Sequence, residues 1–186
     1  MDAMTLLHQR RSMGKLAAPA PTAEQLDAIY RAALRAPDHK EMTPYRFIEI
    51  SGEGLDRLGE LFARSDYQAN PHIDDGSLDA ARKKPKRAPM IIAVIARITP
   101  DLPKVPPVEQ LISAGCAAHA MLYAAFAQGL GAMWRTGTYA HDRTVWRGLG
   151  LGEHEELVGY LYLGHVGGRY PDAPVRDPEA YLERWR

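Results

Sequence analysis

A long stretch without charged side chains constrains this chain more than any other feature. From Gln110 to Trp134 there is no Asp, Glu, Lys or Arg. The stretch is long enough to cross a bilayer, but Ser113, His119 and Gln128 interrupt it, and no clusters of Lys and Arg flank it. A helix that is apolar all round in a soluble protein lies at the centre of a domain or at a subunit interface. We therefore expect a long buried helix from about Val108 to Gln128.

The composition is that of an ordinary globular protein. The chain has 186 residues, 46% hydrophobic and 25% charged, which suits one domain over residues 1–186. Lys and Arg (23) balance Asp and Glu (23), so no overall positive field exists to hold nucleic acid or an anionic membrane. Cys116 is the only cysteine, which excludes an intrachain disulfide and a cysteine-rich zinc site. The N-terminal residues lack a secretory signal pattern, and we expect a cytoplasmic protein without a metal.

The hydrophobic periodicity predicts few strands, separated by helices. Helices are expected over residues 2–10, from the Thr22 cap to Pro37, and over 55–63, 74–84, 108–128 and 141–148. Strands are expected over 45–50, 89–97, 132–136 and 156–166, with a loop over 66–73 and a surface tail over 167–186. The run over 89–97 is apolar on both sides and should be central. This order favours an α+β fold with helices packed on a small mixed sheet.

The basic run over residues 82–87 has two interpretations. Its sequence, RKKPKR, matches short nuclear-localisation or nucleic-acid motifs. The preceding helix, however, begins with Asp74 and Asp75, and cations suit its C-terminal end. We favour the helix terminus, with the nearby Lys and Arg able to steer a phosphorylated ligand.

Three short segments offer arginines in exposed turns. They are Arg10-Arg11-Ser12 after the first helix, Arg35 to Lys40 after the second, and Trp134-Arg135-Thr136 on the strand after the uncharged helix. Guanidinium groups bind phosphate through paired, charge-assisted hydrogen bonds, so the three segments together favour a phosphate-containing ligand. Taken singly, each has a structural alternative, since arginines stabilise helix C-termini and Trp134 can simply pack.

These segments also carry a family resemblance. In order, the RRS near the start, RAPDHK, the Pro44-Tyr45-Arg46-Phe47 run, SAGCA, AAFAQGLGAMWRTG and YLYLG resemble the FMN-dependent nitroreductase superfamily. The chain is most similar to the small bacterial NAD(P)H nitroreductases, which have the minimal form of that fold. The resemblance covers Met1 to about Gly164.

The resemblance implies a nitroreductase-like homodimer with two FMN molecules at the subunit interface. The matching flavin-binding positions are Arg10, Arg11, Ser12, Arg35, His39, Trp134, Arg135 and Thr136. The positions matching the nicotinamide nucleotide are Ala124, Ala125, Phe126, Ala127, Gln128 and Gly129. The chain departs from many relatives at Gly14, where a basic residue is usual, and at Glu41 and Thr43, which replace Asn and Gln. No catalytic side chain is expected, because the flavin carries the hydride chemistry.

The implied activity is hydride transfer from NAD(P)H to FMN and then to a nitroaromatic, a quinone or a similar small acceptor, in ping-pong order. An alternative is a non-catalytic or very slow FMN-binding structural dimer. A third, a nucleic-acid module built on residues 82–87, is disfavoured by the zero net charge and the lack of interleaved aromatic residues.

Overall fold

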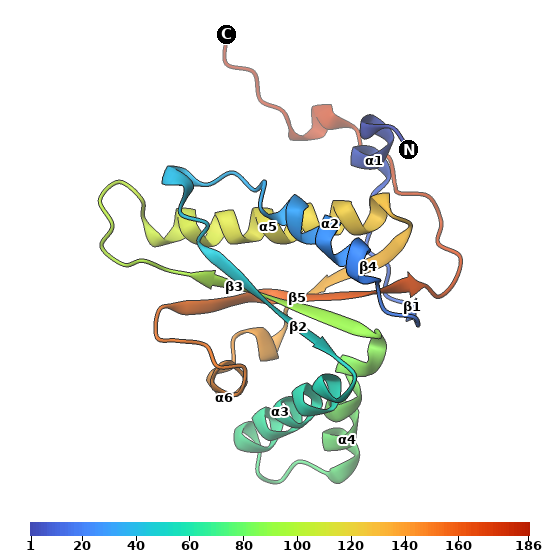
Figure 1. Ribbon diagram of the computed structural model, residues 1–186, viewed down its shortest axis with the longest axis vertical. Coiled ribbons are helices and arrows are strands. Elements are labelled where there is room, and N and C mark those ends of the chain that lie inside the picture. Colours follow the sequence, from blue (N-terminus) through green and yellow to red (C-terminus); the bar gives the residue numbers. More distant parts are fainter.

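One antiparallel sheet of five strands organises the computed structural model, which describes residues 1–186 (Figure 1). The strands are β1 (Leu16–Ala17), β2 (Tyr45–Ser51), β3 (Met90–Arg97), β4 (Leu130–Arg135) and β5 (Glu155–Val166). Their order is β1-β5-β3-β2, and β4 pairs with the other edge of β5.

Every strand pair is antiparallel, which corrects the mixed sheet expected from the sequence. Two helices, α3 (Glu53–Ala69) and α4 (Asp75–Lys83), connect β2 to β3, and β3 returns antiparallel to β2. The helix α5 (Pro107–Ala127) connects β3 to β4, which run in the same direction. Because β5 lies between β3 and β4, that crossover creates no parallel pair.

The remaining helices are α1 (Ala3–Gln9), α2 (Ala23–Ala33) and α6 (Arg143–Gly148). Thr22 and Gln25 form the capping box expected at the start of α2. The loop expected over residues 66–73 is wrong in its first part, because α3 continues to Ala69. No Gly or Pro interrupts residues 64–70, so nothing in the sequence ends the helix earlier.

The sheet separates two hydrophobic cores. In Figure 1, α2 and α5 lie above the sheet, and α3, α4 and α6 lie below it. Ile92 and Val94 of β3 face the α5 side, whereas Ile91 and Ile95 face the α3 side, and all four are fully buried. The predicted central strand is thus confirmed.

Helix α5 is buried on its inner face. It is long and apolar enough to cross a membrane by length and composition alone, but in this fold it packs against the sheet and α2. Gln110, only 1% exposed, donates to the backbone oxygens of Thr99 and Val105 and accepts from Thr99 N. On the outer face Val108 and Ile112 are 58% and 60% exposed.

Candidate functional site

The first and third arginine segments meet beside β4. Helix α1 ends at Gln9, and the chain then runs along β4, where Met13 N donates to Ala132 O at 2.9 Å. A Cβ atom on Gly14 would lie 3.2 Å from Met133 Sδ and 3.5 Å from Arg135 Nη2. The absence of a side chain at Gly14 therefore lets the segment with Arg10 and Arg11 lie close to Arg135.

The three guanidinium groups at this junction have unsatisfied donors. Arg10 Nε, Arg11 Nε, Arg11 Nη1 and Arg135 Nε are buried without a hydrogen-bond partner. None of the three arginines belongs to an ion pair of the chain. Buried donors are normally hydrogen-bonded and buried charges are normally paired. The donor set therefore suits an anion with several oxygens, such as a phosphate.

Three tyrosine rings support these guanidinium groups. The Cζ atoms of Arg10, Arg11 and Arg135 lie 5.6, 5.6 and 5.3 Å from the ring centroids of Tyr123, Tyr170 and Tyr162, respectively. A cation over an aromatic face is stabilised without being neutralised. The rings thus hold the cations in place and leave their hydrogen-bond donors free.

Tyr170 belongs to the surface tail and fastens it to the first segment. Its hydroxyl group accepts a hydrogen bond from Lys15 N at 2.5 Å and lies 3.3 Å from Lys15 O. The sequence does not predict Tyr123, Tyr162 and Tyr170 as part of the site, because no local motif links tyrosines on separate elements to these arginines.

A cavity of about 410 Å³ adjoins β4. Trp134, Arg135 and Thr136 line it, together with the aromatic rings of Tyr160 and Tyr162. Thr136 is exposed, and Ser12 of the first segment is exposed as well. All of the third predicted segment therefore borders one cavity.

Trp134 also has a packing role. Its Nε1 donates to Val158 O at 3.3 Å. The β3–β5 register shifts here, and Gly159 has a φ of +151°. A Cβ atom on Gly159 would lie 2.3 Å from Trp134 Nε1, so the indole fits only against a glycine.

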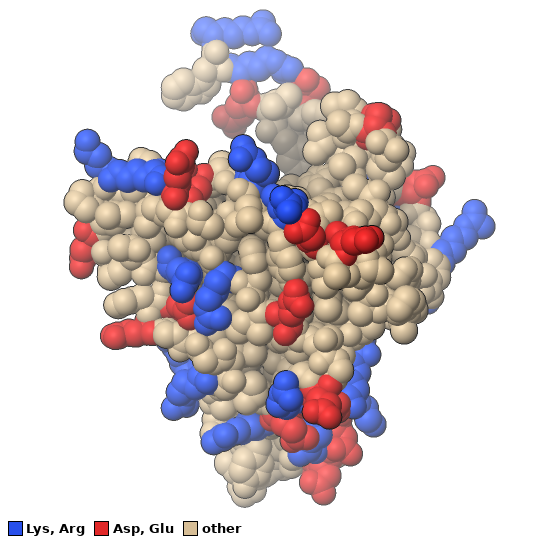
Figure 2. Space-filling view, in the orientation of Figure 1, with Lys and Arg blue, Asp and Glu red and all other residues tan.

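The basic run over residues 82–87 is divided between two surroundings. Arg82 and Lys86 form ion pairs of 2.9 and 2.5 Å with acidic residues of α3. Lys84 and Arg87 instead line the cavity beside Trp134 and Arg135, which the basic motif by itself does not predict. Figure 2 shows positive and negative side chains interspersed over the visible face, without a continuous basic patch.

Within one chain, the His39 end of the second predicted segment lies apart from the other two segments, whereas Arg35 borders a cavity that Tyr123, the ring beneath Arg10, also lines. His39 Nδ1 is 2.9 Å from Oε2 of Glu109, in the first turn of α5. Arg10 lies over Tyr123, fourteen positions further along the helix, a rise of about 21 Å. Arg35 borders a second cavity, of about 610 Å³, between α1, α2 and α5. The structure therefore does not bring His39 to the arginine cluster.

The stretch matched to the nicotinamide nucleotide forms the end of α5. Ala124 and Ala127 line the second cavity, whereas Ala125 is buried in the core and Phe126 is half-buried. Gln128 Nε2 donates to Gln25 O at 3.2 Å and to Ala124 O at 3.0 Å, which joins α5 to α2. Gly129, with a φ of +75°, ends the helix.

The positive charge of Arg10 affects the titration of His119 on α5. Its partial burial, and then the positive charge of Arg10, lower its pKa. Its ring packs edge-on against Tyr123 at 4.7 Å. The neutral form of His119 is therefore favoured beside Arg10.

Comparisons with known proteins identify relatives along most of the chain. The model of the Nitroreductase family matches residues 7–165. The protein named "Putative NAD(P)H nitroreductase YdjA" from Escherichia coli K12 is 48% identical over 164 residues, 88% of both chains. A protein of Haemophilus influenzae Rd named "Putative NAD(P)H nitroreductase" is 40% identical over 164 residues, with the same coverage of both chains.

Solved structures share the fold. A nitroreductase-like protein from Bacillus cereus superposes with a TM-score of 0.83 at 21% identity, over 100% of this chain and 96% of that one. A nitroreductase from Desulfovibrio desulfuricans, solved in complex with FMN, gives 0.70 at 24% identity over 98% and 96%. Sequence and structure together place the chain in the nitroreductase family.

Proposed function

We propose that the protein is an FMN-dependent oxidoreductase that takes hydride from NAD(P)H and delivers it to a nitroaromatic, a quinone or a similar small acceptor. The observation that carries the proposal is the set of buried, unpartnered guanidinium nitrogens of Arg10, Arg11 and Arg135, the last of which lines an aromatic cavity. The names of the bacterial relatives and the FMN complex of a structural neighbour support it. We also propose a cytoplasmic location.

The residues present fit FMN. Its phosphate carries nearly two negative charges at neutral pH, which the three arginines can neutralise, with the exposed hydroxyl of Ser12 as a further donor. The cavity lined by Trp134 and Thr136 can hold the ring system. When bound, FMN would supply the redox chemistry: it would accept a hydride from NAD(P)H and pass that hydride, with a proton from solvent, to the acceptor.

The chain's own residues would bind and orient the flavin and stabilise its negative charge. Lys84 and Arg87 provide positive charge in the cavity, which favours a flavin that has gained electrons. The end of α5, residues 124–129, would receive the nicotinamide nucleotide. The hydride donor and the acceptor would react with the flavin in turn, which gives ping-pong kinetics.

We expect the purified protein to be yellow and to release FMN on denaturation, because the buried guanidinium donors of Arg10, Arg11 and Arg135 lack partners in the chain and suit the FMN phosphate. The absorbance spectrum before and after denaturation measures this. A colourless protein that also fails to bind added FMN in a titration contradicts the proposal.

Reduction of the bound flavin by NADH or NADPH distinguishes an enzyme from a slow FMN-binding structural dimer. Anaerobic mixing with NADH or NADPH should bleach the flavin absorbance in the enzyme. A yellow protein that neither nucleotide bleaches supports the structural dimer.

We also propose that two chains form the complete site as a homodimer. The outer face of α5 exposes Val108 and Ile112, and apolar surface of this kind favours association. His39 lies about 21 Å along α5 from Tyr123, the ring beneath Arg10, so His39 would join a flavin site at the arginines from a second copy, whereas Arg35 borders the cavity that Tyr123 lines. A two-fold pairing through α5 places the same surface of both chains in contact.

The homodimer predicts that Ile112→Asp weakens both association and FMN binding, because a charge is then buried in the interface. Light scattering at micromolar concentration measures the mass, and fluorescence titration measures the flavin affinity. Tyr67→Asp on α3, where the side chain is 52% exposed on the far side of the sheet, is the matched control. A wild-type monomer that holds FMN tightly would refute the shared site.

A further inference from the structure

Three side chains outside the predicted site are connected by hydrogen bonds at the edge of the cavity. Lys84 Nζ donates to Tyr139 Oη at 2.5 Å, and Tyr139 Oη donates to Asp66 Oδ2 at 2.7 Å. They come from three elements: the end of α4, the turn Thr138–Ala140 that follows β4, and the C-terminal part of α3. Both Lys84 and Tyr139 line the cavity with Arg135.

The direction of both hydrogen bonds is set by chemistry. An ammonium group only donates and a carboxylate only accepts, so the hydroxyl group of Tyr139 must accept from Lys84 and donate to Asp66. Burial, and then the hydrogen bond to Asp66, raise the pKa of Tyr139, which keeps the phenol protonated. The hydroxyl group therefore connects a cation to an anion without carrying charge.

The ring of Tyr139 is held firmly. It stacks on Phe62 with 4.0 Å between centroids and 4° between planes, and it is 9% exposed. Lys84 Nζ also lies 4.5 Å from the centroid of the Tyr139 ring. A free lysine side chain samples many rotamers. The contacts with Tyr139 restrict Lys84 to few of them and so define where its ammonium group lies.

Lys84 keeps its positive charge available. It forms no ion pair, unlike Arg82 and Lys86 of the same run. The carboxylate of Asp66 is linked to Lys84 through Tyr139, and two of the three N–H donors of Lys84 have no hydrogen-bond partner in the chain.

We propose that Tyr139 and Asp66 are positioning residues that hold the Lys84 ammonium group in the cavity, where it stabilises the negative charge of reduced FMN. Hydride uptake adds two electrons and one proton, and so leaves one additional negative charge on the ring system. A fixed cation in a partly desolvated cavity favours that state more than a mobile one in water. The inference rests on the proposed function.

The reduction potential of bound FMN tests the inference without relying on turnover. Tyr139→Phe keeps the ring and removes the hydroxyl group. We expect it to reduce the preference for reduced over oxidised FMN about tenfold, which lowers the potential by about 30 mV for a two-electron couple. Lys84→Met should lower the potential at least as much, and adding Tyr139→Phe to it should change nothing further, because Tyr139 acts through Lys84.

Substitutions of Asp66 distinguish two effects on the FMN potential: the positioning of Lys84 through Tyr139, and the direct effect of the Asp66 charge. Asp66→Asn retains an acceptor for the Tyr139 hydroxyl and should keep the wild-type potential, whereas Asp66→Ala should lower it. If Asp66 acted by its charge alone, both substitutions would raise the potential, because a negative charge would be removed.

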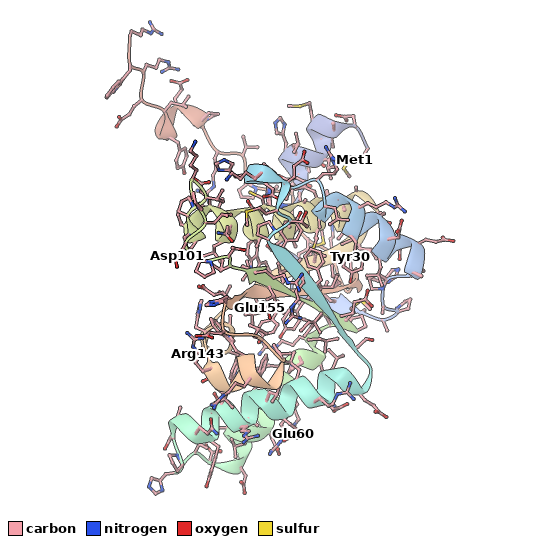
Figure 3. All side chains as sticks on the ribbon, turned by 60° about the vertical axis from the view of Figure 1, so that its left-hand side comes forward. Met1, Tyr30, Glu60, Asp101, Arg143 and Glu155 are labelled. Carbon is pink, nitrogen blue, oxygen red and sulfur yellow. The ribbon has the colours of Figure 1, made fainter.

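Tyr30→Phe is the matched control. The hydroxyl group of Tyr30 donates to Glu49 Oε1 at 2.7 Å, but no lysine joins this pair. Figure 3 shows Tyr30 on the opposite side of the sheet from Glu60 of α3. Its substitution should leave the potential unchanged, and thermal unfolding of each variant confirms that it folds.

The possible failures can be told apart. A chain that binds no FMN overturns the proposed function and this inference with it. A chain that binds FMN, and whose potential responds to Lys84→Met but not to Tyr139→Phe or Asp66→Ala, overturns the inference alone. The inference is also overturned if Tyr139→Phe shifts the reduction potential equally in the wild-type protein and in the Lys84→Met variant. If Tyr139→Phe does not fold, the two Asp66 variants decide.

Discussion

Replacing Arg10 with alanine is expected to weaken FMN binding by roughly 1.5–3 kcal/mol, the value of a charged hydrogen-bonded contact. This corresponds to about a 10- to 150-fold higher Kd. The stability of the apoprotein should fall by no more than about 1 kcal/mol, because Arg10 Nε is buried without a hydrogen-bond partner and the substitution removes only the contact over the Tyr123 ring. Calorimetric titration measures the affinity, and chemical unfolding of the apoprotein measures the stability.

Arg82→Ala is the matched control for Arg10→Ala. Arg82 forms ion pairs with Glu60 and Asp79 on the surface and should leave FMN binding nearly unchanged. Equal losses of affinity in both variants would mean that the phosphate site is misplaced. A marked loss of apoprotein stability on Arg10→Ala would instead assign Arg10 a structural role.

Gly59→Ala is expected to destabilise the protein by about 2–4 kcal/mol, at the upper end for overpacking. Gly59 lies on α3, and a Cβ atom there would come within 2.4 Å of the backbone oxygen of Arg82 on α4. A backbone carbonyl cannot rotate away as a side chain can, so the two helices must separate. The shift would also displace Lys84, two residues further along the chain.

Gly54→Ala on the same helix provides the comparison. A Cβ atom there would lie 3.3 Å from Ile50 Cγ2, the end of a side chain that can adjust. We expect a change within about 1 kcal/mol, since alanine is also favoured over glycine in helices. Similar midpoints of urea unfolding for both variants would contradict close α3–α4 packing as the cause.

The sequence alone predicted the elements with strong periodicity. The uncharged stretch became α5, and the run that is apolar on both sides became the central strand β3, because long apolar patterns admit few placements. It also predicted two of the segments that meet at β4, Arg10–Ser12 and Trp134–Thr136. The end of α3 was less predictable, because helix ends depend on weak local signals.

Tertiary structure decided which distant side chains share the site. The tyrosines that support the arginines, and the Lys84–Tyr139–Asp66 connection, come from elements far apart in the chain. No pattern in one segment can encode such a contact, because strand order determines which loops meet. The basic run over residues 82–87 shows the same dependence: one sequence motif became two surface ion pairs and two cavity cations, according to which neighbour each side chain faces.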